Sequence, residues 1–288
     1  MNSIPFISPV KQITVCLAIL LTGFASCHET EDYVEASEVS NTVTISLTDD
    51  GGSALVSLAG VTAGAFFAGS NGDVASSIAE VGKGGTIVLP ASARQGNVVV
   101  CTPWQDEWTV SGTPTNLAFR VEADQTMPSA YQASDLMAGR AATGVSSVVM
   151  KHLLARIVVH VVDETGNMDF SHISPMLQNM KDAVGVNLQQ QLFTTQESMS
   201  NIKMNAYATT DRRLSAQAIV APQTIAAGTQ LIAVQIYGSL QWCPVTEHLQ
   251  LTGGNTYTFS VRLTETGLVP DGCQISDWED DGGGTLTI

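Results

Sequence analysis

The residues whose spacing most resembles a metal site are acidic and lie near the C-terminal end of the sequence. Asp277, Glu279 and Asp281, followed by Gly282, reproduce the alternating oxygen ligands and the sixth-position glycine of a calcium-binding loop. The twelfth position of such a loop requires a bidentate carboxylate, and here it is Ile288. A solvated acidic turn explains the same residues, so we expect no bound metal and keep the three acids as weak calcium candidates.

Side chains suited to catalysis are present but scattered. No Gly-x-Ser-x-Gly nucleophile motif occurs. The glycine-rich segment 82–86 lacks the spacing of a phosphate-binding loop and precedes a strand-like run, so it predicts a hairpin turn. The five histidines give no spacing that makes a metal-binding face: His28, His152, His160, His172 and His248. We therefore expect no catalytic residues, no cofactor and no enzymatic activity.

Three of the five cysteines lie beyond the N-terminal region: Cys101, Cys243 and Cys273. Their spacing matches no zinc pattern. If a disulfide forms, we expect it between Cys243 and Cys273, because these two are close in sequence. Closing the 31-residue loop between them would contribute about 3–4 kcal/mol in the chain-entropy model. Three buried thiols that pack as small hydrophobic side chains are an equally open alternative.

The first 27 residues are typical of a secretory signal. Lys11 precedes an apolar run over 13–24, which is shorter than the ~20 residues of a membrane-spanning helix. The run ends in Phe24-Ala25-Ser26-Cys27, which resembles the lipobox of bacterial lipoproteins, with Phe24 in place of the usual Leu. We expect an acylated Cys27 to hold the chain in outer-membrane lipid, since two or three acyl chains anchor durably. An ordinary cleaved signal with an incidental cysteine is the alternative.

An acidic segment follows Cys27, with five acids between Glu29 and Glu38. It predicts a solvated tether over 28–41. It also resembles the acidic export signal that Bacteroidetes lipoproteins carry behind the lipidated cysteine when they reach the cell surface. The two interpretations are compatible, and both predict a surface-exposed lipoprotein of the cell outer membrane.

Composition excludes some classes of function. The 288 residues include 12 Lys and Arg against 27 Asp and Glu, a net charge of −15 that would repel a phosphate backbone, so nucleic acid is not an expected partner. Hydrophobic residues make up 44% of the chain and charged residues 14%, which indicates a protein with a buried core.

Beyond the tether, the sequence pattern is that of short strands. Thr42 to Leu47 alternates polar and apolar residues, and Asp49 to Gly52 supplies a turn. The segment 174–184 is amphipathic and a candidate helix or loop, with a pattern too irregular to assign, and 129–139 predicts a loop with a short helical turn at most. Further runs lie at 86–89, 98–101, 117–121, 145–162, 204–209, 216–220, 231–237, 256–263 and 285–288. About a dozen strands and hardly any helix predict an all-β chain with two β-sandwich domains, at 42–155 and 156–288.

Several segments between residues 131 and 280 carry a resemblance to one family, the fimbrillin-type lipoproteins of Bacteroidetes. In that family a loop with Asp-Leu precedes a His-x-Leu-x-Arg-Ile strand, as in 131–138 and 150–159 here. Residues 219–225 are similar to its apolar-Pro-Gln element, 251–259 to its Leu-x-x-Gly-x-x-Tyr strand, and 275–278 to its Ile-x-x-Trp ending. The N-terminal half matches only in its strand pattern.

The resemblance implies two tandem transthyretin-like (Greek-key) sandwiches and a place in a surface fimbrium, or pilus, that serves cell adhesion. It also implies other fimbrial subunits as partners, through β-strand exchange in which one subunit's strand completes the sheet of the next. In the best-known branch of the family, cleavage after an arginine near the first strand removes the lipidated leader. No Arg or Lys lies between Cys27 and Gly82; beyond Cys27 the first basic residue is Lys83 and the first arginine is Arg94. This departure favours an anchor or minor subunit.

A non-polymerising surface lipoprotein that binds glycans is the alternative function. Exposed Trp and Tyr side chains beside polar groups would favour it. Trp104 and Trp108 form the only close pair of the four tryptophans, and a contact within the core explains that pair equally well.

Overall fold

The structure of the chain is a computed structural model. It describes residues 41–68, 74–105, 108, 117–144, 146–166, 168–187, 192–210 and 212–278. The signal segment, the tether up to residue 40, Cys27, Glu279, Asp281 and the strand predicted at 285–288 lie outside the described residues. The all-β class predicted from the sequence is confirmed, because nearly all of the regular structure is strand.

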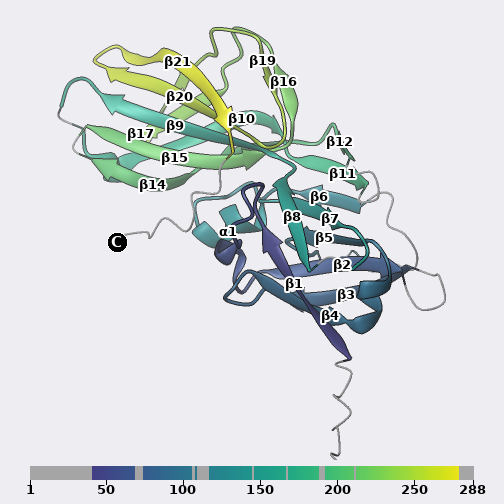
Figure 1. The fold of residues 1–288 in the computed structure, drawn as a ribbon. Helices are drawn as coiled ribbons and strands as arrows, with labels where there is room; N and C mark the ends of the chain where they lie inside the picture. Colours follow the sequence, from purple (N-terminus) through teal and green to yellow (C-terminus); the bar gives the residue numbers. More distant parts are fainter. Residues whose placement is uncertain are drawn as a thin grey trace, which may run out of the picture. The chain divides into compact units, whose positions relative to one another are not determined.

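A seven-stranded sheet is built entirely from residues before 153 (Figure 1). All of its neighbouring strands are antiparallel except β8 and β1, which run parallel. In sheet order the strands are β3 (Val74–Glu80), β2 (Thr62–Ala68), β5 (Val98–Thr102), β7 (Met137–Ala141), β8 (Ser147–His152), β1 (Thr42–Thr48) and β4 (Thr86–Pro90).

The later residues form two larger sheets. The five-stranded sheet has the order β14 (Asn205–Thr210), β15 (Arg213–Val220), β9 (Ala155–Asp163), β20 (Asn255–Thr264) and β21 (Gly267–Asp277). The four-stranded sheet has the order β13 (Met199–Lys203), β10 (Ile173–Lys181), β17 (Ile232–Ile236) and β18 (Ser239–Cys243). Figure 1 shows β9, β15 and β20 running together in the five-stranded sheet.

Two small sheets complete the described strands. One joins β12 (Leu192–Thr195), β11 (Ala183–Asn187) and β6 (Leu117–Arg120), and the other joins β16 (Gln223–Ile225) to β19 (Leu249–Leu251). Because β6 pairs with β11, backbone hydrogen bonds connect strands from before and after residue 155. Residues 40–288 form one compact unit, and the division into domains at residue 155 stays a prediction.

Helix is limited to one short α-helix, α1 (Pro128–Ala133), and three 3-10 turns, η1 (Val56–Leu58), η2 (Ala91–Gln95) and η3 (Phe170–His172), within the described residues. Pro128 occupies the first turn of α1, where its missing N–H costs no hydrogen bond. No helix among the described residues is long and apolar enough to cross a membrane.

The buried side chains form two clusters, and β5 contributes to both. Val98 and Val100 point into the cluster that also holds Ile45 and Leu47, whereas Val99 and Cys101 point into a larger one. A strand whose two faces are both covered has no polar alternation, which explains the continuous run Val-Val-Val-Cys. The larger cluster also contains Ile157, Val159 and Val161, which alternate along β9 and so share one face.

The structure contains more strands than the sequence pattern revealed. The turn predicted at 49–52 is present, and a turn at 82–86 is closed by a hydrogen bond from Gly82 N to Thr86 O. The hairpin predicted at 82–86 is wrong, because β3 pairs with β2 and β4 with β1 rather than with each other. The helix or loop considered for 174–184 is wrong, because that segment falls on β10 and the start of β11. Residues 137–139 of the predicted loop likewise belong to strand β7. β2, with the sequence Thr-Ala-Gly-Ala-Phe-Phe-Ala, shows no β-branched alternation, since pairing with β3 and β5 rather than intrinsic preference makes it a strand.

Candidate functional site

The first candidate site is the position that β1 occupies between β4 and β8, which we call the β1 slot. β1 pairs with β4 over residues 42–46, and its last three residues pair with β8. Val43, Ile45 and Leu47 are all buried, while Thr42 and Thr44 on the opposite face are exposed. This alternation places the apolar side chains of β1 in the core that Ile87 and Leu89 of β4 also line.

Backbone hydrogen bonds fix the register of β1 at its C-terminal end. Leu47 N donates to Gly85 O at 2.7 Å, and Ser46 N donates to Ser146 O at 2.8 Å. Burying each of the three apolar side chains contributes about 1.5–3 kcal/mol. The β1 slot is therefore a site that an apolar, alternating strand fills, and in this chain the strand that fills it comes from the same polypeptide.

The second candidate site is a contact among three residues from separate sequence motifs, which we call the junction cluster: Asp135, His152 and Trp278. Oδ1 of Asp135 accepts a 2.7 Å hydrogen bond from Nδ1 of His152. The imidazole ring of His152 stacks on the indole of Trp278, with ring centroids 3.9 Å apart and planes 6° apart. Asp135 follows α1, His152 ends β8, and Trp278 follows β21.

Backbone hydrogen bonds also connect the segments that meet at the junction cluster. Leu153 N donates to Leu136 O, Gly254 N to Leu154 O, and Trp278 N to Gly254 O, at 2.8–2.9 Å. A Cβ atom at Gly253 would lie 2.3 Å from the carbonyl oxygen of Leu153, so only glycine fits there. The Leu-x-x-Gly-x-x-Tyr motif therefore brings a glycine pair against the chain that leaves β8.

Buried glutamines join other loops to the strands. Gln223, of the apolar-Pro-Gln element, accepts from Lys181 N at 3.0 Å and donates to Ala221 O at 2.8 Å. Gln125 accepts from Ile219 N and donates to Ile219 O, both at 2.8 Å. Buried amides are stable only when they are hydrogen-bonded, so the two glutamines fix the ends of β10 and β15.

The sequence segments that meet at the junction cluster match a known family. The model of the fimbrillin-like family aligns with residues 83–278. The chain belongs to the fimbrillin-like family. This membership makes it a fimbrial or adhesion-type surface protein, of a structural rather than an enzymatic class, that associates with other fimbrial subunits.

Solved structures share the fold of this fimbrillin-like chain. A proposed cell adhesion protein of Bacteroides ovatus has a TM-score of 0.62 at 13% identity, covering 83% of this chain and 97% of that one. One from Bacteroides uniformis has a TM-score of 0.59 at 13% identity, covering 84% and 99%. The tip fimbrial protein Mfa3 of Porphyromonas gingivalis, truncated at its C-terminus, has a TM-score of 0.51 at 10% identity, covering 82% and 98%. These likenesses concern the fold. No curated protein matches the chain.

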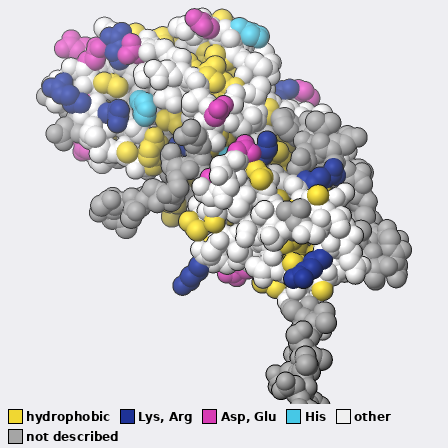
Figure 2. Space-filling view, in the orientation of Figure 1, with side chains coloured by type: hydrophobic (Ala, Val, Ile, Leu, Met, Phe, Trp, Pro, Cys, Tyr) yellow, Lys and Arg dark blue, Asp and Glu magenta, His cyan; other side chains and the backbone are white. Residues whose placement is uncertain are grey.

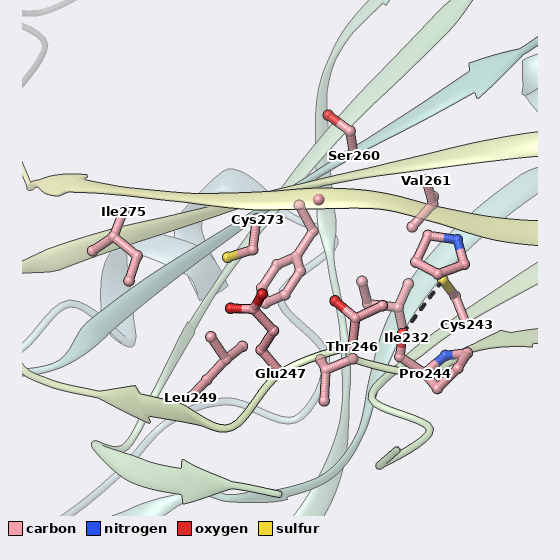
Figure 3. A pocket seen from close by; sticks show the side chains of 14 residues that line it. Ile232, Cys243, Pro244, Thr246, Glu247, Leu249, Ser260, Val261, Cys273 and Ile275 are labelled. Carbon is pink, nitrogen blue, oxygen red and sulfur yellow. Dashed lines mark hydrogen bonds between the residues drawn. The ribbon is translucent and has the colours of Figure 1, made fainter. Parts of the chain in front are cut away.

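The cysteines of the fimbrillin-like chain lie in two places. Cys243 and Cys273 line one pocket of about 250 Å³ beside Glu247 and Thr246 (Figure 3). Burial raises the pKa of both thiols to about 11, and for Cys273 the nearby Glu247 adds to this. Protonated thiols are weak nucleophiles. Cys101 is fully buried in the core, and burial raises its pKa to about 12. All three are free thiols here, and the Cys243–Cys273 disulfide stays a prediction.

Trp108 lies in the core, and Trp104 packs against it. Trp104 and Trp108 meet edge to face with ring centroids 5.7 Å apart, and Phe66 and Phe119 flank them. Trp108 is buried, and its indole N–H donates to Ala118 O at 2.7 Å. The buried Trp108 therefore offers no exposed platform for a sugar ring, and Trp104 is partly buried against the same cluster.

The remaining predicted residues do not come together as a metal site. Within the described part of the chain, no group of three or more His, Cys, Asp or Glu side chains could hold an ion. Asp277 is exposed at the end of β21, and Glu279 and Asp281 lie outside the described residues. His160 lies on β9, where its Nδ1 is 2.9 Å from Ser215 Oγ. Spacing along the sequence did not reveal that neighbour, because the two strands pair only in the sheet.

Proposed function

We propose that this fimbrillin-like protein is an anchor or minor subunit of a surface fimbrium, held by lipid on Cys27, which retains β1. A strand of another subunit can enter the β1 slot only after β1 leaves. A chain that keeps β1 donates a strand to a neighbour but accepts none, so it occupies one end of a polymer.

One observation carries the proposal: the apolar side chains of β1 are buried in its own sheet. The sequence adds that no basic residue lies between Cys27 and Gly82. The first basic residue after Cys27 is Lys83, which lies in the turn between β3 and β4, beyond β1, β2 and β3. Cleavage at a basic residue therefore cannot detach β1 alone. Lipid on Cys27 and an intact β1 together favour a subunit tied to the outer membrane.

Mass spectrometry of the mature protein from the cell surface tests the proposal. The expected N-terminus is an acylated Cys27 followed by His28, and a Cys27→Ser variant, matched in size, should lose the acyl mass. A mature N-terminus beyond residue 45 would contradict the proposal, because β1 would then have been cut.

Electron microscopy of the cell surface tests the fimbrial role itself. Cells that lack the protein should show fewer, shorter or detached fibres, and restoring it should recover them. Unchanged fibres in its absence would instead favour a surface lipoprotein that does not polymerise.

A further inference from the structure

A polar groove of about 440 Å³ lies on the outer face of the five-stranded sheet. Small-molecule sites occupy roughly 300–1,000 Å³, so its size fits a ligand of a few sugar units. Its lining includes Arg156 and His160 of β9, Thr256 and Thr258 of β20, Tyr207 of β14 and Asp277 of β21.

The sheet register explains why these side chains gather. Arg156, Val158 and His160 alternate on β9 and so share one face. Arg156 stands beside Thr256, and Val158 beside Thr258, in the parallel pairing of β9 with β20. Val158 is only 4% exposed, so it makes an apolar floor between two polar side chains.

The groove cannot be filled by adding a strand. β15 pairs with β9 along its whole length on one side, and β20 pairs with it on the other. The backbone N–H and C=O groups of β9 are therefore used within the sheet. A ligand in this groove must be recognised by side chains, which separates the groove from the β1 slot.

The chemistry of the lining is close to neutral. It contains one guanidinium, that of Arg156, and one carboxylate, that of Asp277. Burial, with a smaller effect from Arg213, lowers the pKa of His160, which favours the uncharged ring at neutral pH. The chain carries a net charge of −15, and Figure 2 shows basic and acidic side chains scattered over the face in view without a large patch of one sign. An anionic ligand gains little from such a surface.

We propose that this groove binds a neutral oligosaccharide, with Tyr207 against a sugar ring and Arg156, Asp277 and the threonine hydroxyls on the sugar hydroxyls. Tyr207 is 37% exposed, so its ring is open to a ligand, and an amphipathic aromatic ring beside polar groups suits a sugar. This activity is separate from the proposed fimbrial role, since it uses no strand exchange and no lipid.

Isothermal titration calorimetry on the full-length chain tests the proposal. The probes are neutral hexasaccharides of glucose, mannose and xylose, together with a galacturonic acid hexasaccharide of matched length. At least one neutral probe should bind with a Kd below about 1 mM. Tyr207→Ala and the nearly isosteric Asp277→Asn should each weaken that binding at least about tenfold, equivalent to ~1.4 kcal/mol.

The matched control is Tyr237→Ala, which removes another exposed tyrosine, at the turn between β17 and β18. It should leave the affinity unchanged. Circular dichroism and thermal unfolding should show that every variant folds. The proposal fails if no neutral probe binds at millimolar concentration, if the acidic probe binds better, or if Tyr207→Ala and Asp277→Asn bind like the unaltered chain. None of these outcomes bears on the N-terminus or the fibres, so the fimbrial role is tested separately.

Discussion

His152 stacks face to face on Trp278, although the two residues are 126 positions apart in the sequence. The side chain of His152 is only 6% exposed, and its Nδ1 lies 2.7 Å from Oδ1 of Asp135. The indole therefore covers the imidazole at the end of β8. Three motifs that mark the family in sequence thus serve one packing contact.

Replacing Trp278 with alanine should destabilise the fold. The substitution removes a stacked ring pair, worth about 0.5–1.5 kcal/mol beyond area burial, together with the buried area itself, so we expect a loss of about 1–3 kcal/mol in urea unfolding. Trp242→Ala is the control, since that side chain is 46% exposed, and it should cost clearly less. Equal losses for both variants would show that the stack contributes nothing specific.

Gly253→Ala should be strongly destabilising because its new methyl group would meet backbone rather than a movable side chain. The nearest atom, Leu153 O, would lie 2.3 Å away. Overpacking of this kind costs about 1–3 kcal/mol. Gly84→Ala is the control, because nothing lies within 4 Å of a Cβ there. Thermal unfolding should show a lower Tm for the first variant alone, and an unchanged Tm for Gly253→Ala would refute the close contact.

The stability that Asp163 contributes should depend on pH. Burial raises the pKa of this carboxyl, but hydrogen bonds from Thr165, Met168 and Gly166 outweigh burial and hold the pKa below its ordinary value of 3.8. A lowered pKa in the folded state means that the ionised group stabilises the fold above pH 3.8, and that this contribution is lost as pH falls through the folded pKa.

Asp163→Asn should therefore cost about 1–3 kcal/mol at pH 7, and the difference from the unaltered protein should shrink below about pH 4. Urea unfolding at several pH values measures this difference. The exposed Glu265→Gln serves as the control and should change little at any pH. A difference that stays constant down to the lowest pH would contradict the assignment.

An arginine placed directly after β1 should make the β1 slot available. Asp50 lies in the exposed turn 49–52, and its 3.6 Å pair with Lys151 is solvent-exposed on both sides, so Asp50→Arg should fold normally. An arginine-specific protease should then cut after residue 50, which allows β1 to leave and a strand of another copy to enter. Size-exclusion chromatography should show larger assemblies, with the cut site verified by mass spectrometry.

The matched control for this experiment is Asp50→Asn, which has no arginine before Arg94. It should remain uncut in this region and keep its size. If the cut Asp50→Arg chain retains β1 and stays a single copy after mild heating, the β1 slot is not an acceptor under these conditions.

The sequence by itself determined the strand-rich class, the positions of the strongly alternating strands and the family. Period-two patterns and family motifs lie within short segments, such as Thr42 to Leu47 and His152 to Ile157, so they can be recognised from the sequence alone. It did not determine β2, the strand nature of 174–184 or the neighbours of His160, because long-range pairing decides these and backbone preference does not.

Only the tertiary structure decided that Trp108 is a core residue with Trp104 packed against it, that Cys243 and Cys273 share a pocket, and that Asp135, His152 and Trp278 meet. It also placed Tyr207 of β14, Arg156 of β9 and Thr258 of β20 along one groove, although these residues come from separate segments of the sequence. The physical reason is common to all of them: a sheet brings together residues that are far apart in sequence, and the burial of one face fixes which side chains share the other.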